Sequence, residues 1–389
     1  MRLKPGRDKR IRAGHPWAYS DEIETGEATR ALPPGGLVTL ASADGSALGI
    51  ATYNPHPLIA ARLLSRDPRA EIDTAFIARR LQRALDLRER LFEGPFYRLV
   101  HGEADGLAGL TLDRYGDTVV AQMTTAGMDR FSPMVLEALD EVVRPGVVVL
   151  KNDRSVREME GLESSIKVAK GRLEGATELV ENGTRFLVDA IEGQKTGWFY
   201  DQRDNRAFMA RLSRGRRVAD FYCYAGGFSI QAAVAGASEV VAVDRSADAL
   251  ALAARSAELN GVAERCAFVR SEVFAELKRL AEAGERFDIV IADPPAFVKS
   301  RKDLAVGLKG YQKLFRSAAA LVRPAGLLFV ASCSHNVDEE LFAAQVRHAL
   351  RRAGRNGRII RSAGAAPDHP LHPFLPESGY LKAAVLELD

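Results

Sequence analysis

The sequence predicts an α/β protein in which a doubly wound parallel sheet follows a small β-rich module and a compact α+β segment. From about residue 183 onward, apolar strand patterns alternate with helical patterns, which is typical of a parallel sheet covered by helices. Residues 1 to about 72 instead hold short apolar runs separated by turn residues. At 389 residues, the chain is long enough for two or three domains.

Composition limits the class of protein. The chain is 47% hydrophobic and 27% charged, and no apolar run reaches the roughly 18 residues of a membrane span. The basic N-terminus is not followed by the apolar stretch of a secretory signal. Three cysteines (Cys223, Cys266 and Cys333) cannot all pair, and neither they nor the histidines show a metal-binding spacing. We therefore expect a cytoplasmic protein without metal or membrane partners; its oligomeric state stays open.

The N-terminal module combines strand signals with a basic, aromatic segment. Residues 37–40 and 47–51 are strand-like runs joined by a turn at 43–46, and a third run covers 58–64. Residues 2–12 hold six Lys or Arg and one Asp, and Trp17 follows shortly after. Arg12 and Trp17 are thus candidates for phosphate contact and base stacking. The residues alone leave open a solvated basic tail with Trp17 in the core.

The middle segment, about 75 to 180, reads as a helix–strand–strand–helix–strand unit. Its elements follow apolar periodicity, and they are a helix at 74–93, strands at 111–115 and 119–123, a helix at 133–143 and a strand at 147–150. The polar stretch 154–175 is predicted to be a flexible link.

The C-terminal half supplies the parallel sheet. Strands are predicted at 218–222, 240–243, 267–269, 289–292 and 327–332. Helices are predicted between and after them, at 228–235, 247–259, 273–283, 311–322 and 338–353.

The first strand of this half leads into a candidate cofactor loop. Gly226 and Gly227 precede a helix, where paired glycines allow a tight turn and close approach of a ligand. The next strand ends in Asp244, which is placed to accept hydrogen bonds from ribose hydroxyls, and Ser246 has the character of a helix N-cap. Glu272 could bind an adenine amino group or simply favour a helix N-terminus. Because no GxGxxG motif is present, a nucleoside without phosphates, such as S-adenosylmethionine, fits better than a dinucleotide.

Two further strand ends carry the candidate chemistry. Asp293-Pro294-Pro295 ends one strand and Ser332-Cys333-Ser334 ends the next. Ligands of parallel sheets bind at these carboxyl ends. A thiolate at Cys333 could add to C6 of cytosine and make C5 nucleophilic, with Asp293 hydrogen-bonded at N3 and the exocyclic amine. Lys299 and its basic neighbours Arg301, Lys302 and Lys309 are placed to contact phosphates of a substrate whose target base is unpaired or extruded.

At these motifs the chain resembles the bacterial class I S-adenosylmethionine-dependent large-subunit (23S) rRNA cytosine-C5 methyltransferases with an N-terminal PUA domain. The resemblance covers nearly the whole length. It rests on the segments 15–17, 102–110, 193–197, 201–206, 224–228, 293–295, 310–311, 332–334, 368–370 and 380–382.

The resemblance implies a PUA RNA-binding domain at 1–73, a central α+β domain at 74–180 and a Rossmann-like methyltransferase domain at 181–389. It implies Cys333 as nucleophile, whereas the catalytic role of Asp293 follows from the strand-end chemistry described above. Implied methyl-donor contacts are Gln194, Lys195, Thr196, Asp201, Gln202, Arg203, Tyr224, Gly226, Gly227, Asp244, Ser246, Glu272 and Asp293. The substrate contacts expected from the residues and motifs together are Pro294, Pro295, Lys299, Trp17 and Arg12.

Some positions depart from the family pattern. Ala296 stands where a lysine is frequent, Glu272 where Asp is common, and His335 where some relatives have a small residue. No cysteine follows Asp293-Pro294, so another base must remove the C5 proton. Two alternatives remain open: methylation of another rRNA base or an exocyclic amine without a thiol nucleophile, and an RNA-binding factor that lacks turnover.

Overall fold

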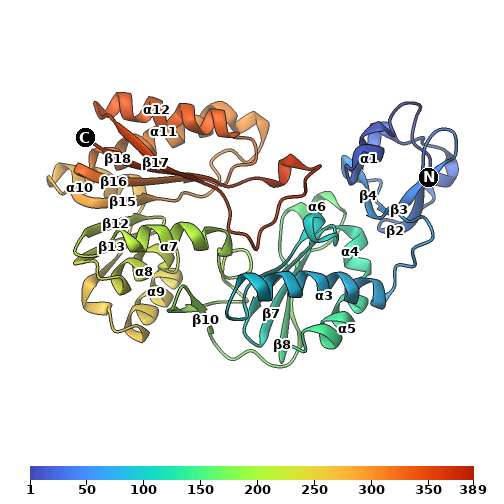
Figure 1. The fold of residues 1–389 in the computed structure, drawn as a ribbon, viewed down its shortest axis with the longest axis horizontal. Coiled ribbons are helices and arrows are strands. Elements are labelled where there is room, and N and C mark those ends of the chain that lie inside the picture. The colour runs from blue at the N-terminus through green and yellow to red at the C-terminus, as the bar shows by residue number, and fades with distance from the viewer. The chain divides into compact units, whose positions relative to one another are not determined.

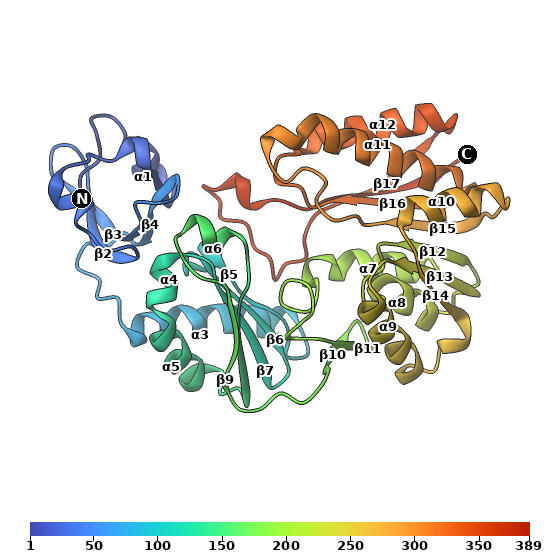
Figure 2. The ribbon, with the colours of Figure 1, turned by 180° about the vertical axis from the view of Figure 1, so that it is seen from behind.

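The computed structural model describes the backbone of residues 1–389, together with all side chains except those of Ala28 and Arg30. The chain divides into two compact units. The first unit contains Met1–Thr177, Asp189–Trp198 and Pro367–Ser378. The second contains Glu178–Val188, Phe199–Ala366 and Gly379–Asp389. Figures 1 and 2 show the elements of each unit from opposite sides.

The first unit begins with a four-stranded antiparallel sheet. Its order is β1 (Trp17–Tyr19), β4 (Ile59–Ser65), β3 (Ala47–Tyr53) and β2 (Gly36–Ala41). The short helices α1 (Lys9–Ala13) and α2 (Glu27–Arg30) lie in the same segment. Leu3, Ile11 and Ile23 bury their side chains with strand residues such as Leu40 and Ala51. The three strands predicted after residue 36 are confirmed.

A five-stranded sheet forms the rest of the first unit. Its order is β5 (Phe96–His101), β6 (Leu110–Tyr115), β7 (Thr118–Met123), β8 (Val147–Asn152) and β9 (Ser165–Lys170), and only β7 and β8 pair in parallel. Helices α3 (Thr74–Leu91) and α5 (Ser132–Val142) bury apolar side chains with those of the sheet, whereas α4 (Ala126–Arg130) and α6 (Val156–Met159) are short.

The predicted flexible link at 154–175 is wrong, because α6 and the edge strand β9 lie there. Nearly every side chain of β9 is exposed, so the strand carries no buried apolar face that a sequence pattern could reveal. Its backbone bonds to β8 define it instead. Strand β5 also went unpredicted.

The second unit is built on a seven-stranded sheet in the order β14-β13-β12-β15-β16-β18-β17. The strands are β12 (Arg217–Phe221), β13 (Glu239–Asp244), β14 (Cys266–Arg270), β15 (Phe287–Ala292), β16 (Val322–Ser332), β17 (Gly357–Ala363) and β18 (Lys382–Leu388). The helices are α7 (Arg203–Arg211), α8 (Gly227–Val234), α9 (Ala247–Leu259), α10 (Val273–Glu282), α11 (Leu304–Ala320) and α12 (Glu339–Ala353). A hairpin of β10 (Thr177–Glu181) and β11 (Thr184–Val188) precedes them.

The predicted five-stranded parallel sheet is confirmed as β12 to β16, and the structure adds two strands that were not predicted, β17 and β18. β18 pairs antiparallel with both β16 and β17. No helix crosses over between β17 and β18, so the chain returns in the opposite direction along the sheet. This arrangement places Lys382 opposite Ser332, next to the predicted nucleophile.

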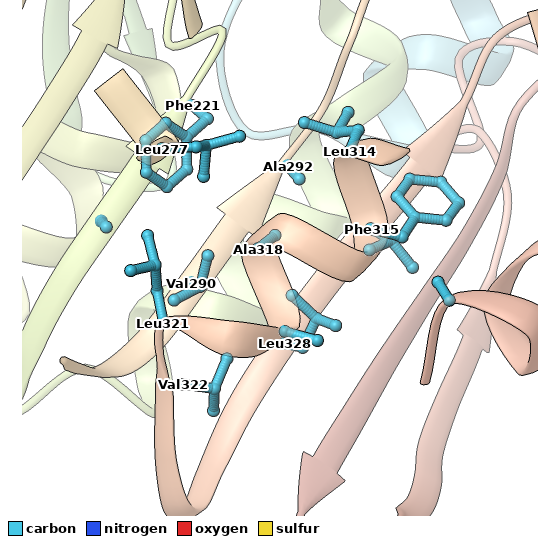
Figure 3. Packing of buried hydrophobic residues seen from close by; sticks show 14 of the residues in the cluster. Phe221, Leu277, Val290, Ala292, Leu314, Phe315, Ala318, Leu321, Val322 and Leu328 are labelled. Carbon is cyan, nitrogen blue, oxygen red and sulfur yellow. The ribbon is translucent and has the colours of Figure 1, made fainter. Parts of the chain in front are cut away.

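Helices cover both faces of this sheet, with α10, α11 and α12 on one side and α7, α8 and α9 on the other (Figures 1 and 2). Figure 3 shows Leu314, Phe315 and Ala318 of α11 packed with Val290 of β15 and Leu328 of β16. Between β12 and β15 the strand order reverses, and such a reversal opens a ligand crevice at the carboxyl ends of strands.

Helix α11 begins at Leu304, seven residues before the predicted start at Tyr311, and Val322 belongs to β16 rather than to the helix. Two glycines explain the difference, because they lower intrinsic helix propensity. A Cβ at Gly307 would lie 2.4 Å from Val298 Cγ2, and one at Gly310 would lie 3.0 Å from Phe297 Cδ2. The glycines therefore let α11 pack against the loop after β15.

Across the described residues, we find no helix with the length and apolar character that crossing a membrane requires.

Candidate active site

The loop between β12 and α8 has an unusual backbone. Tyr222, Tyr224 and Gly226 have φ values of 65°, 50° and 78°. Positive φ at non-glycine residues costs roughly 1–3 kcal/mol each and clusters at ligand sites. A Cβ at Gly226 would lie 2.8 Å from Ile230 Cδ1 and 3.0 Å from Ala253 Cβ, so this position requires glycine. This loop is the one that the sequence analysis predicted to approach the cofactor, and it lies at the carboxyl end of β12.

Asp244 connects this loop to the end of β13. Its Oδ2 accepts a hydrogen bond from the backbone N–H of Tyr224 at 2.9 Å, and its Oδ1 accepts one from Ser246 at 2.9 Å. Only 9% of Asp244 is exposed. Ser246 is confirmed as an N-cap, since its Oγ accepts from the N–H of Ala249 at 3.2 Å. The carboxylate therefore has a fixed orientation beside the glycine pair, and each oxygen keeps a second lone pair.

Asp220 is a buried acid that the sequence reasoning missed. Its Oδ2 accepts from both the backbone N–H and the hydroxyl of Ser229, at 3.1 and 2.5 Å. Its Oδ1 has no hydrogen-bond partner among the described residues. Burial raises the pKa of Asp220 to about 7. The sequence did contain a signal for Asp220: it is an acid one residue before the end of an apolar strand, and the glycine pair follows that strand.

Asp201, Gln202 and Arg203 lie at the start of α7. Asp201 is buried and accepts a hydrogen bond from the Tyr380 hydroxyl at 2.6 Å. Gln202 accepts one from Asn205 at 2.7 Å. Just ahead of them, the ring of Phe199 lies edge-to-face on that of Tyr224, with centroids 5.3 Å apart. The structure therefore brings this segment to the cofactor loop.

Arg203 is tied into the same unit. Its Nε lies 3.8 Å from the carboxylate of Glu181, and its guanidinium lies 5.2 Å from the centre of the Tyr200 ring. Glu272, by contrast, is exposed directly before α10, and its side chain does not cap that helix. The carboxylate of Glu272 is therefore accessible at the end of the third parallel strand.

Gln194, Lys195 and Thr196 belong to the first unit, and its five-stranded sheet holds Lys195 and Thr196. Tyr115 donates to the carbonyl of Thr196 at 3.2 Å, and the Thr196 hydroxyl donates to Asp113. Gln122 donates to the carbonyl of Lys195 at 3.4 Å. The structure therefore places Lys195 and Thr196 beside β6 and β7 of the first unit.

Trp17 and Arg12 also lie in the first unit. Trp17 is half-buried, and its indole N–H donates to Glu103 at 2.8 Å. Arg12 is exposed, and its guanidinium donates hydrogen bonds to the Asp8 carboxylate at 2.5 Å and to the Ser42 hydroxyl at 3.2 Å. Trp17 is therefore neither a core residue nor a fully exposed stacking platform.

The loops after β15 and β16 meet at the predicted nucleophile. Cys333 is partly exposed, and its Sγ lies 4.0 Å from the carbonyl oxygen of Pro294. On the other loop, the backbone N–H of Asp293 donates to the carbonyl of Phe221 at 3.4 Å, which attaches the Asp-Pro-Pro segment to the end of β12. The structure thus brings the two predicted catalytic residues to one region.

Ser334 and Tyr311 hold the two loops together. The Ser334 hydroxyl shares a 2.8 Å hydrogen bond with the Tyr311 hydroxyl and accepts one from the N–H of Val298 at 3.1 Å. Tyr311 also accepts from the N–H of Phe297 at 3.3 Å. Both Ser334 and Tyr311 are about 1% exposed, so water competes little for these bonds.

The remaining predicted residues differ in exposure. Pro294 is buried, whereas Pro295 and Lys299 are exposed, as are Arg301, Lys302 and Lys309. The other two thiols are in different environments from Cys333: burial raises the pKa of Cys223, and it raises the pKa of Cys266 to about 11. A raised pKa lowers the thiolate fraction and makes both poor nucleophiles.

Comparisons with known proteins agree with this geometry. Residues 160–350 match a family of S-adenosylmethionine-dependent methyltransferases, and residues 1–66 match a PUA-like domain. The ribosomal RNA large subunit methyltransferase I of Aeromonas hydrophila is 36% identical over 390 residues, which cover 99% of this chain and 98% of that protein. The enzyme of the same name from Escherichia coli O157:H7 is 35% identical over 98% of this chain and 97% of that protein.

The chain belongs to the ribosomal RNA large subunit methyltransferase I family. It is an S-adenosylmethionine-dependent methyltransferase. The fold also resembles that of a candidate methyltransferase from Streptococcus mutans, with a TM-score of 0.84 at 22% identity over 100% of this chain and 99% of that one.

The carboxylates of this methyltransferase suit its methyl donor. Asp220, Asp244, Glu272 and Asp293 lie in or directly after the carboxyl ends of four neighbouring strands, β12, β13, β14 and β15. S-adenosylmethionine carries a positive sulfonium, an ammonium group and ribose hydroxyls, all of which acidic oxygens bind well. The bonding capacity left on Asp220 Oδ1 is further evidence that a ligand with hydrogen-bond donors fits here.

The raised pKa of Asp220 predicts a pH-dependent stability. The carboxyl has a pKa of 3.8 in the unfolded chain and about 7 in the fold, so the native state binds this proton more tightly. Stability from this group is therefore lost as the pH rises from about 4 to 7. We expect Asp220→Asn to be more stable than wild type by at most ~4 kcal/mol at pH 8 and by less than half of that at pH 5.

Urea unfolding of both proteins without donor, at pH 5 and pH 8, measures this difference. The exposed Asp248→Asn serves as the control and should show no such pH dependence. A stability difference between wild type and Asp220→Asn that is the same at both pH values contradicts the assignment.

Proposed function

We propose that this methyltransferase transfers a methyl group from S-adenosylmethionine to C5 of a cytosine in large-subunit (23S) ribosomal RNA, through a covalent intermediate at Cys333. The observation that carries the proposal is the approach of Cys333 Sγ to the Asp-Pro-Pro loop, 4.0 Å from the Pro294 carbonyl oxygen. A thiol beside a carboxylate-bearing loop is the pair of groups that activation of a pyrimidine requires. The names of the family's relatives support the substrate class.

The chemistry assigns each residue a step. The Cys333 thiolate adds to C6 of the ring, and the electron pair shifts to C5. Asp293, carried by the loop attached to β12, holds N3 and the exocyclic amine and balances the charge that develops there. The bound donor supplies the electrophilic methyl group. A base then removes the proton from C5, the C5–C6 double bond re-forms and the thiolate leaves.

Donor binding is assigned to residues of both units. In the second unit these are Asp201, Gln202, Arg203, Tyr224, Gly226, Gly227, Asp244, Ser246, Glu272 and Asp293. In the first unit they are Gln194, Lys195 and Thr196.

RNA binding is assigned to three places in the chain. Pro294 and Pro295 would contact the target base, and Lys299 would contact a phosphate. Arg12 and Trp17 would contact RNA from the PUA-like module. The domain limits at 73/74 and 180/181 belong to the same proposal, as does action in the cytoplasm, where ribosomes are assembled.

Methyl transfer from labelled S-adenosylmethionine to unmodified large-subunit ribosomal RNA tests the proposal. The product RNA is digested to nucleosides, which are separated and identified. We expect the label in 5-methylcytidine. Label in a purine or in an N-methylated nucleoside would support the alternative, methylation without a thiol nucleophile. Donor binding without methyl transfer would support an RNA-binding role.

A further inference from the structure

Lys382 is a buried cation that the proposed mechanism leaves without a role. It is the first residue of β18, and only 6% of it is exposed. Its Nζ donates to the carbonyl oxygens of Ser334 and Tyr380, both at 2.8 Å. Burying a lysine is costly unless the ammonium group is satisfied by strong acceptors or a nearby negative charge. Carbonyl acceptors alone offset only part of the free-energy cost of burying the ammonium group.

The position of Lys382 in the sheet brings it to both sides of Cys333. In the antiparallel ladder Lys382 is the partner of Ser332, the residue before the thiol. Its side chain then reaches the carbonyl of Ser334, the residue after the thiol. Lys382 is thus linked to both neighbours of Cys333, through its backbone to Ser332 and through its ammonium group to Ser334.

Building on the function proposed above, we propose that Lys382 is a positioning residue for Cys333. Its backbone and its ammonium group fix the residues on either side of the thiol, and the positive charge stabilises the thiolate that adds to C6. The thiolate is the reacting form, so a fixed cation beside the loop increases the reactive fraction at neutral pH.

The charged groups around the thiol are consistent with this role. Burial lowers the pKa of Lys382, whereas negative charge on Cys333, Asp338 and Glu339 opposes that shift. Asp338 and Glu339 lie at the start of α12, and both are exposed.

Three further titratable groups face the loop. Tyr311 comes from α11, and burial raises its pKa, so it stays neutral at neutral pH. His335 follows in the thiol's own loop and stacks on the ring of Tyr380 with centroids 5.3 Å apart. Asp293 lies beside Pro294, whose carbonyl approaches Sγ. Lys382 supplies a buried positive charge to this set.

The test measures the rate at which iodoacetamide alkylates Cys333 as a function of pH. The full-length protein is used without donor or RNA, and mass spectrometry resolves the Cys333 peptide from the other two. Wild type should titrate below about 8.5, the ordinary thiol value. Lys382→Met should raise the midpoint by about one pH unit, which lowers the thiolate fraction roughly tenfold at pH 7.

Two further variants separate charge from packing. Lys382→Arg keeps the charge and should stay near the wild-type midpoint. Lys278→Met, which removes a lysine that is 75% exposed on α10, should leave it unchanged. An unchanged midpoint in Lys382→Met overturns the proposal. If Lys382→Met does not fold, a wild-type alkylation midpoint at or above the ordinary thiol value of about 8.5 overturns the proposal instead.

Because alkylation needs no RNA, its outcome is independent of which nucleoside is methylated. Label in a nucleoside other than 5-methylcytidine would therefore refute the proposed function without altering the alkylation result. An ordinary thiol midpoint would refute the role of Lys382 and leave cytosine methylation standing.

Discussion

Replacing Cys333 with alanine should abolish formation of 5-methylcytidine, lowering the rate by about 10⁴-fold or more. C5 of cytosine is a poor nucleophile until a thiolate adds at C6, and burial raises the pKa of both Cys223 and Cys266. Neither thiol is therefore able to replace Cys333. The measurement is transfer of labelled methyl groups to large-subunit RNA, with Cys266→Ala as the matched control that should retain activity.

A second readout tests the covalent step itself. RNA that carries 5-fluorocytosine at the target should trap a protein–RNA adduct, because the C5 fluorine cannot be removed as a proton. The adduct should form with wild type and with Cys266→Ala and be absent with Cys333→Ala. An adduct or full activity in Cys333→Ala would contradict the assignment of Cys333 as the nucleophile.

Replacing Asp244 with alanine should weaken donor binding by about 100-fold. Hydrogen bonds to a charged group contribute roughly 1.5–3 kcal/mol, and about 3 kcal/mol corresponds to that factor. The variant also leaves the backbone N–H groups of Tyr224 and Ser246 without the acceptor that orients the loop. Isothermal titration with S-adenosylhomocysteine measures the effect.

The control is Asp248→Ala, four residues further on and exposed in the first turn of α9. It should bind the ligand as wild type does. Circular dichroism and thermal unfolding establish whether the Asp244→Ala sheet is intact. An intact variant with an unchanged dissociation constant would contradict the assignment of Asp244 to the ribose.

Much of the candidate active site was predictable because a parallel sheet imposes one geometric rule. All of its strands end at the same edge, so residues that follow buried apolar runs must meet there. Gly226, Asp244, Asp293 and Cys333 were identified in this way, and the structure places them at or after the ends of β12, β13, β15 and β16. The family resemblance added Asp201 to Arg203, which no local pattern indicated.

Other features depend on contacts between segments far apart in sequence. Asp220 resembles any strand aspartate until the fold buries it against Ser229. The early start of α11 depends on close packing of Gly307 against Val298. Intrinsic helix propensity does not account for such a tertiary contact. Strand β9 has almost no buried side chains, so only its pairing with β8 reveals it.

The sequence by itself determined how strands and helices alternate along the chain to form the parallel sheet. It also determined which acids and which thiol follow the carboxyl ends of the strands. These follow from local periodicity and from a rule that holds for every such sheet. Only the tertiary structure decided that β18 runs antiparallel beside β16 and brings Lys382 to the residues on either side of Cys333. The physical reason is that backbone hydrogen bonds between distant segments set the direction of a strand in a sheet, whereas side-chain periodicity is the same in either direction.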